Sequence, residues 1–204
     1  MLAAQDEVWK FESLTSIGGH AVRAEGHPRV IETAAGKAVE FGGGEDALFV
    51  DVHPLAGATA FTWEVIFRPD AGGAAEQRFF HLQEAATENR MLFELRVVEG
   101  KWCLDSFAIS GTESKALLNW QKLHSLSAWH HAAAVYDGKT YRNYVDGELE
   151  GEAELHLAPQ GAGSTSIGTR INRKDYFKGA VLVARMTRRA LGTGEFLTVP
   201  AGLR

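Results

Sequence analysis

The sequence WHHAAAVYDGKTYRNYVDGELEG, residues 129–151, contains two Asp-Gly pairs, and each pair separates two short apolar runs. An Asp-Gly pair suits the positive φ angles of a tight β-turn, and between apolar runs it is the strongest short-range signal for a hairpin. The pairs at 137–138 and 146–147 therefore predict a meander of three antiparallel strands, at 129–136, 140–145 and 148–155.

The rest of the chain shows the same pattern of short apolar segments separated by turn residues, with 22 glycines in 204 residues. Short strands bounded by turn signals are typical of a sandwich or barrel. Only residues 84–90 and 194–197 are expected to form helical turns. The sequence has no visible linker, repeat or second core, which predicts one all-β domain over residues 1–204. Further strands are expected at 7–11, 37–41, 48–52, 61–68, 78–83, 91–98, 102–109, 164–168 and 177–187.

Charge and composition exclude several classes of function. The net charge is −5 and the pI is about 5.9, so the basic field of a nucleic-acid-binding domain is lacking. No apolar run approaches the ~20 residues that cross a bilayer. The single cysteine, Cys103, excludes an intrachain disulfide and is expected to be a buried strand thiol. Residues 1–5, MLAAQ, look like a start methionine before a small-residue cleavage boundary, which favours an exported protein, periplasmic or extracellular.

The hairpin at 129–151 resembles the signature hairpin of LamG-like jelly-roll domains, which belong to the concanavalin A-like lectin/glucanase superfamily. The resemblance implies two curved antiparallel sheets packed face to face, with the first and last strands adjacent. Members of this superfamily bind glycans or proteins, or cleave glycans, so the fold alone does not fix the function. Other segments match the family in order: VWKFES (8–13), GKAVEFGGGEDALFV (36–50), FTWEVIFRPD (61–70), SIGTR (166–170), YFKGAVLVARMTRRAL (176–191) and the final GEF.

The resemblance also implies a structural calcium ion near the loop after the second strand, where Glu45 and Asp46 offer carboxylates. Calcium takes six to eight oxygen ligands. The family pattern adds an acidic residue in the last strand, whereas residues 177–182 of this chain contain no carboxylate. The interpretation favoured here is that Glu45 and Asp46 solvate a turn.

Strand alternation predicts which side chains face the core, because successive side chains point to opposite faces of a sheet. In 61–68 the inward residues are expected to be Phe61, Trp63, Val65 and Phe67, and in 91–98 Met91, Phe93, Leu95 and Val97. The outward residues are then expected to share one polar, ligand-binding sheet face, which comprises Glu64, Glu94, Arg96, Arg142 and Tyr144.

This polar face admits three interpretations. Planar polar side chains in a concavity bind sugars. A pair of carboxylates, Glu64 and Glu94, is the minimum for hydrolysis of a glycosidic bond, but the Glu-x-Asp-x-x-Glu pattern of related glucanases does not occur. Cross-strand Glu–Arg pairing would only stabilise the sheet, and this interpretation is favoured over catalysis.

Other candidate ligand contacts lie outside that face. His81, beside Arg78 and a polar connection at 84–90, resembles the base of jelly-roll polysaccharide lyases; alternatively, it is an edge-strand histidine with a local hydrogen bond. A metal site from His81 and Glu84 would lack further ligands. Trp120, in the segment 115–125 expected to be a long loop, either stacks on a sugar ring or folds over the core. His130 and His131 are expected to pack or hydrogen-bond structurally.

The sequence thus predicts a non-catalytic domain that binds a ligand, with a glycan as the favoured ligand class. The first alternative is a glycan-processing enzyme, either a hydrolase or a lyase, that uses Glu64, Glu94 and His81. The second is a protein–protein adhesion module, for which the acidic, disulfide-free chain is suited.

Overall fold

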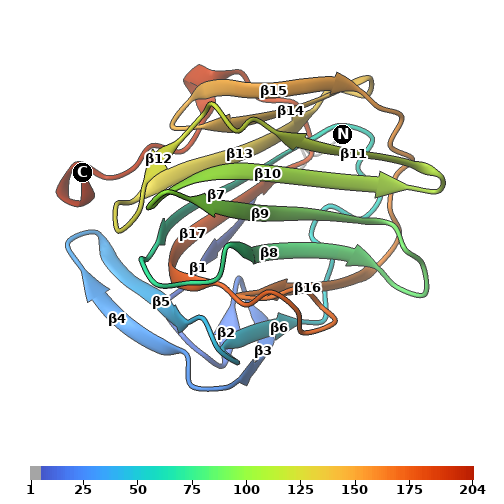
Figure 1. The fold of residues 1–204 in the computed structure, drawn as a ribbon. Coiled ribbons are helices and arrows are strands. Elements are labelled where there is room, and N and C mark those ends of the chain that lie inside the picture. The colour runs from blue at the N-terminus through green and yellow to red at the C-terminus, as the bar shows by residue number, and fades with distance from the viewer. Residues whose placement is uncertain (1–5) are drawn as a thin grey trace.

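The fold is a sandwich of two antiparallel β-sheets, described over residues 6–204 of a computed structural model (Figure 1). The expected cleavage boundary at residues 1–5 lies outside the described residues. The eight-stranded sheet has the order β15-β14-β13-β7-β17-β5-β4, and β1 pairs with β17, so the first and last strands are adjacent as predicted. Its strands are β1 Glu7–Lys10, β4 Arg29–Thr33, β5 Gly36–Gly42, β7 Phe61–Pro69, β13 His130–Tyr136, β14 Thr140–Val145, β15 Glu148–Glu154 and β17 Lys178–Thr187.

The nine-stranded sheet has the order β11-β10-β9-β8-β16-β6-β3-β2, and β12 pairs with β10. All of its strand pairs are antiparallel, which confirms the predicted all-β jelly-roll sandwich. Its strands are β2 Ser16–Ile17, β3 His20–Glu25, β6 Ala47–Val50, β8 Glu76–Glu84, β9 Arg90–Val98, β10 Lys101–Ser110, β11 Glu113–Leu118, β12 His124–Ser125 and β16 Gly163–Ile167.

The predicted meander is present as β13, β14 and β15. At its second turn, Asp146 has φ 50° and Gly147 has φ 85°. Positive φ at both central residues is the geometry for which an Asp-Gly pair is suited. The first strand begins at His130 rather than at Trp129, so Trp129 lies in the connection that precedes it.

Aromatic side chains from the two sheets meet in the core. The rings of Trp63 in β7 and Phe93 in β9 stack at 4.0 Å between centroids, and those of Phe67 and Phe79 stack at 4.2 Å. The predicted inward residues of both strands belong to this one cluster. Stacked rings add about 0.5–1.5 kcal/mol beyond the burial of their surface.

Several elements differ from expectation. The strands β2, β3, β4, β11 and β12 were not predicted, because only Ile17 and Leu117 among their residues are buried and they give no apolar pattern. The expected helical turn at 84–90 is instead the turn between β8 and β9. The segment expected to form a loop at 115–125 contributes residues 115–118 to β11.

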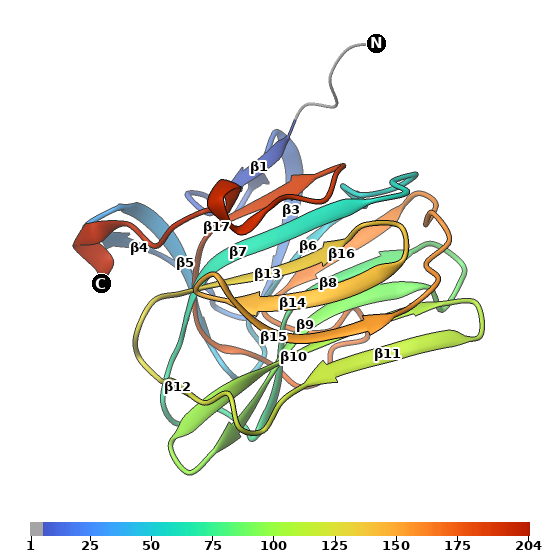
Figure 2. The same cartoon turned by 90° about the horizontal axis from the view of Figure 1, so that it is seen from above.

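The two sheets are also joined at one side of the sandwich, where β11 of one sheet approaches β15 of the other (Figure 2). The buried side chain of Asn143 donates a hydrogen bond from Nδ2 to the carbonyl oxygen of Leu117 at 3.0 Å. Asn119 Nδ2 donates to the carbonyl oxygen of Glu150 at 3.3 Å.

The C-terminal segment, residues 188–204, covers the outer face of the eight-stranded sheet (Figure 2). It contains two short 3-10 helices, η1 Thr193–Glu195 and η2 Ala201–Leu203. Its apolar residues pack on outward side chains of β7, β13 and β17: Leu191 and Phe196 on Ala133 and Val135, and Leu197, Val199 and Leu203 with Ile66 and Leu182. None of the helices in residues 6–204 has the length and apolar character to cross a bilayer.

Candidate functional site

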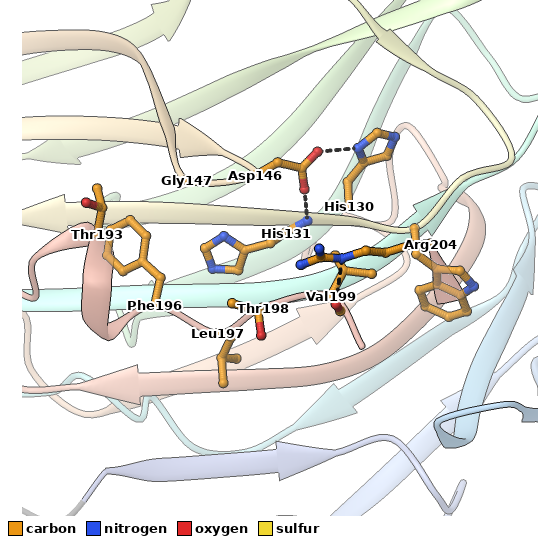
Figure 3. A pocket seen from close by; sticks show the side chains of 11 residues that line it. His130, His131, Asp146, Gly147, Thr193, Phe196, Leu197, Thr198, Val199 and Arg204 are labelled. Atoms are coloured by element: carbon orange, nitrogen blue, oxygen red, sulfur yellow. Dashed lines mark hydrogen bonds and ion pairs between the residues drawn. The ribbon is translucent and has the colours of Figure 1, made fainter. Parts of the chain in front are cut away.

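A pocket of about 490 Å³ lies between the start of β13, the β14–β15 turn and the C-terminal segment (Figure 3). Its size falls within the range of roughly 300–1,000 Å³ that is usual for small-molecule sites. It is lined by Trp129, His130, His131, Asp146, Gly147, Thr193, Phe196, Leu197, Thr198, Val199 and Arg204.

Asp146 organises the polar side of the pocket. Its Oδ1 accepts a hydrogen bond from the backbone amide of His131 at 2.8 Å, and its Oδ2 lies 2.8 Å from Nδ1 of His130 (Figure 3). Burial on its own would raise the pKa of Asp146, but the hydrogen bonds from His130 and the His131 amide outweigh it and hold the pKa below its usual value. The pocket therefore contains an ionised carboxylate in a fixed position.

The two neighbouring histidines point to opposite sides of β13 (Figure 3). His130 Nε2 lies 2.9 Å from the carbonyl oxygen of Ser125, so both ring nitrogens of His130 face oxygen atoms. His131 Nε2 lies 3.0 Å from Oε1 of Glu64. The expectation that this pair forms structural hydrogen bonds is confirmed.

The apolar side of the pocket is built from aromatic and aliphatic side chains. Trp129 is half-buried, and the guanidinium of Arg68 lies 5.4 Å from its ring centroid. The ring of Phe196 packs against His131 at 5.5 Å and against Tyr144 at 5.2 Å. The pocket thus combines aromatic surface with fixed polar groups.

Glu64 lies beneath this pocket and has no exposed surface. Its Oε1 accepts a hydrogen bond from the amide of Leu197 at 2.7 Å, and its Oε2 accepts one from Nε of Arg185 at 2.7 Å. Together with the contact to His131, these bonds fix the C-terminal segment to the sheet. In this structure Glu64 is an internal anchor of the pocket wall.

The prediction that Glu64, Glu94, Arg96, Arg142 and Tyr144 share one sheet face is wrong. Glu64 in β7 and Arg142 and Tyr144 in β14 belong to the eight-stranded sheet, whereas Glu94 and Arg96 in β9 belong to the nine-stranded sheet. Both sheets bury one face in the common core, so their outer faces lie on opposite sides of the molecule. Alternation correctly separates inward from outward residues, but it does not say to which sheet a strand belongs.

The structure does bring together three of the predicted residues of the nine-stranded sheet, Arg78, Glu94 and Arg96. Arg78 Nε lies 3.0 Å from Glu94 Oε2, and Arg96 Nη2 lies 3.1 Å from the same oxygen. Arg96 Nη2 also lies 2.7 Å from Oδ2 of Asp105, and Arg96 pairs with Glu76 as well. Burial raises the pKa of Glu94, although both arginines oppose this shift. This network contains the cross-strand Glu–Arg pairing that the sequence analysis favours over catalysis.

The remaining candidates are separated from one another. Arg142 pairs with Asp137 and Glu152 on the surface, and Tyr144 packs against Phe196 near the pocket. Trp120 follows β11 and is 56% exposed, so its side chain does not fold over the core. Roles for these residues in ligand binding remain predictions.

His81 does not lie at a sheet edge, because β8 is flanked by β9 and β16. Its Nδ1 accepts a hydrogen bond from the amide of Ile171 at 3.0 Å, a partner distant in sequence rather than local. Burial, aided by the positive charges of Arg170 and Arg90, lowers the pKa of His81 to about 3. The ring is therefore neutral and buried.

The loop at which the family resemblance implies a calcium ion does not fit this ion. Asp46 uses one carboxylate oxygen to accept the amide of His27 at 2.7 Å and the other to accept the amide of Gly42 at 2.6 Å. Glu45 is exposed, and β17 brings no carboxylate to this place. Calcium needs six to eight oxygen ligands, so the structure supports the interpretation that these residues form a turn.

Sequence reasoning missed the pocket itself. Asp146 gave a signal only as a turn residue, and Phe196, Leu197 and Val199 lie in a segment without strand or helix periodicity. The paired histidines at the start of β13 were the one visible indication.

Comparison with known proteins identifies the family to which this fold belongs. A family model described as the concanavalin A-like lectin/glucanases superfamily matches residues 41–195, and the chain belongs to this superfamily. A search of curated proteins found no match.

Solved structures show the same fold at low sequence identity. Domain 4 of AbnA, a GH43 extracellular arabinanase from Geobacillus stearothermophilus, in complex with arabinotriose, superimposes with a TM-score of 0.68 and 16% identity, over 93% of this chain and 94% of that one. A heptameric SAP-like pentraxin from Limulus polyphemus gives a TM-score of 0.60 at 18% identity, over 76% and 77% of the two chains. The binding domain of Paraclostridial Mosquitocidal Protein 1 gives 0.66 at 12% identity over 92% of this chain, which spans 49% of that domain. These similarities show the fold.

Proposed function

We propose that this chain is a non-catalytic carbohydrate-binding domain and that its ligand occupies the pocket of Figure 3. The observation that carries the proposal is the combination, in one pocket, of the half-buried Trp129 and the ring of Phe196 with the fixed carboxylate of Asp146. Sugar rings present apolar faces and hydroxyl edges, and mostly apolar pockets with few oriented polar groups bind such ligands.

The polar groups around the pocket suit hydroxyl groups. Asp146 accepts hydrogen bonds, while Thr193 and Thr198 are exposed and each carry a hydroxyl that both donates and accepts. Arg204 adds a cationic donor, with its Nε held 3.1 Å from the carbonyl oxygen of Val199. This set of donors and acceptors favours a hydroxyl-rich ligand over a purely apolar one.

The comparisons support the ligand class only through the fold. The AbnA domain, which this chain matches over nearly its whole length, was solved in complex with arabinotriose. That oligosaccharide is therefore the first probe, followed by an array of neutral and acidic glycans.

The test is calorimetric titration of the protein with arabinotriose and with each array hit. Trp129→Ala removes aromatic surface from the pocket and is expected to weaken binding about two- to tenfold, because stacking on an aromatic ring contributes about 0.5–1.5 kcal/mol. Trp120→Ala, a tryptophan outside the pocket lining, is the matched control and is expected to leave affinity unchanged. Loss of binding in Trp120→Ala but not in Trp129→Ala would show that the site lies at the turn after β11. Absence of binding to arabinotriose and to every glycan of the array would reject the proposal.

A second candidate function is glycan cleavage on the outer face of the nine-stranded sheet. Glu94 and Asp105 are direct cross-strand partners, and burial raises the pKa of Glu94. Two carboxylates in different environments are what a glycosidase uses as acid and base. New reducing ends or unsaturated products that disappear in Glu94→Gln would support this function; a blank across the same polysaccharides would remove it.

A further inference from the structure

A second cluster of donor groups adjoins the pocket. His124 comes from β12, His130 from β13 and Asp146 from the β14–β15 turn, and one ligand atom of each lies within 4.8 Å of the other two. We propose that these three residues bind a transition-metal ion, with Zn²⁺ the best match. This inference does not depend on carbohydrate binding.

Both histidines have the outer hydrogen bonds that metal-bound histidines need. His124 Nε2 lies 2.6 Å from Oε1 of Glu150, and His130 Nε2 lies 2.9 Å from the carbonyl oxygen of Ser125. A ligating histidine usually donates its other ring N–H to a carboxylate or backbone carbonyl, which fixes the tautomer and the ring orientation. This arrangement leaves Nδ1 of each ring for the ion.

The cluster is held rigidly by its surroundings. The ring of Trp102 lies 5.0 Å from that of His124 and 5.2 Å from that of His130, and its Nε1 donates to the same Ser125 oxygen at 3.1 Å. Asp146 is fixed through Oδ1 by the His131 amide, which leaves Oδ2 directed at His130 Nδ1. Rigid donors lose little entropy when an ion binds.

The donor set selects the metal. Two imidazole nitrogens and one carboxylate suit Zn²⁺ and related transition metals, whereas Ca²⁺ requires oxygen ligands. In a tetrahedral Zn²⁺ site with bonds of about 2.0–2.1 Å, the ligand atoms lie about 3.4 Å apart. The widest pair, at up to 4.8 Å, must therefore approach by up to about 1.4 Å, and His130 Nδ1 and Asp146 Oδ2, now 2.8 Å apart, must separate by about 0.6 Å. The ion takes the place of the proton between His130 Nδ1 and Asp146, and that proton passes to solvent.

Three protein ligands leave a fourth coordination position. His130 and Asp146 also line the pocket, so an ion bound to them would lie at the pocket wall. Water, or an oxygen atom of a molecule bound in the pocket, would occupy the fourth position.

The experiment is calorimetric titration of tag-free, chelator-treated full-length protein with ZnCl₂ in the absence of any glycan. One equivalent is expected to bind, and CaCl₂ is expected to give no heat of binding. His124→Gln and Asp146→Asn are expected to abolish saturable binding, and Glu150→Gln, which alters only the outer hydrogen bond, to weaken it about 10- to 100-fold. His156→Gln, an exposed histidine outside the cluster, is the matched control.

Circular dichroism of each variant shows whether it is folded. Asp146→Asn is chosen because asparagine, like aspartate, tolerates the positive φ of this position. Visible absorption of the Co²⁺-loaded protein gives a second readout that reports tetrahedral nitrogen and oxygen ligation directly. Absence of saturable Zn²⁺ binding, or equal binding by the wild type and a folded His124→Gln variant, would overturn the proposal. Neither result bears on carbohydrate binding, so the two proposals fail separately.

Discussion

The buried carboxylate of Glu64 lies 3.0 Å from Nε2 of His131, and the same oxygen accepts the amide of Leu197 at 2.7 Å. One side chain therefore connects β7, β13 and the C-terminal segment. Arg185 pairs with the other carboxylate oxygen and balances the charge. The wall of the pocket depends on an ionic group to which no ligand has access.

We expect Glu64→Ala to destabilise the protein by about 3–5 kcal/mol, because it leaves the charge of Arg185 uncompensated in a buried place. Urea unfolding measures this loss. Amide hydrogen exchange at Leu197 is expected to accelerate, since its acceptor is gone. Glu64→Gln keeps an oxygen for that amide and is expected to retain slower exchange; equal exchange rates in both variants would argue against the anchor.

Arg96 and Arg142 provide a matched pair of arginine substitutions. Arg96→Ala leaves Asp105, which is 3% exposed, without its cation beside Glu94, which is 6% exposed and keeps only Arg78. We expect a cost of about 3–5 kcal/mol in the free energy of unfolding. Arg142→Ala removes only surface pairs and is expected to cost less than about 1 kcal/mol. Similar losses in the two variants would contradict the assignment of a buried network.

His81 is expected to make stability depend on pH. Its pKa is lowered from 6.5 to about 3 in the folded state, so between these values the unfolded chain binds more protons than the folded one. Stability is then fully present above pH 6.5 and falls as the pH decreases, by up to about 1.4 kcal/mol per pH unit.

Unfolding by urea at pH 7, 6 and 5 measures this slope. Burial also lowers the pKa of His53, so this residue likewise reduces the free energy of unfolding as the pH falls. His81→Gln is therefore expected to reduce the slope without removing it, and an unchanged slope would show that His81 does not titrate in this way.

Cys103 is expected to be inert in the folded protein. Its side chain is fully buried in β10, and burial, with Glu150 and Asp105 nearby, raises the pKa of the thiol to about 11. Because the thiolate is the reactive form, a disulfide reagent at pH 8 is expected to label the protein only as fast as it unfolds. Immediate labelling without denaturant would contradict this burial.

The sequence predicts strands and their inward faces because local chemistry determines both. Trp63 lies between the polar residues Thr62 and Glu64, and its ring meets that of Phe93 in the core as expected. The assignment of each strand to a sheet depends on the path of the whole chain, and for this reason Glu64 and Glu94 were wrongly placed together.

The pocket could not be predicted for a related reason. Phe196 and Leu197 contribute through tertiary packing of an irregular segment, which has no periodic signal in the sequence. The convergence of His124, His130 and Asp146 likewise joins positions 22 residues apart through a turn and a short two-residue strand. The sequence indicates only the hairpin that carries Asp146 and the paired histidines at its start.

The bond from Asn143 to the Leu117 carbonyl has a consequence for self-association. An unpaired strand edge can recruit a strand from another molecule. Here the side-chain amides of Asn143 and Asn119 donate hydrogen bonds between the edge of one sheet and that of the other. At the opposite margin of the eight-stranded sheet, β4 carries Arg29 and Glu32, and charge of this kind also discourages recruitment. Neutral hydrogen bonds protect the edge formed by β11 and β15, and salt does not weaken them. Charged side chains protect the edge formed by β4, and salt screens their effect.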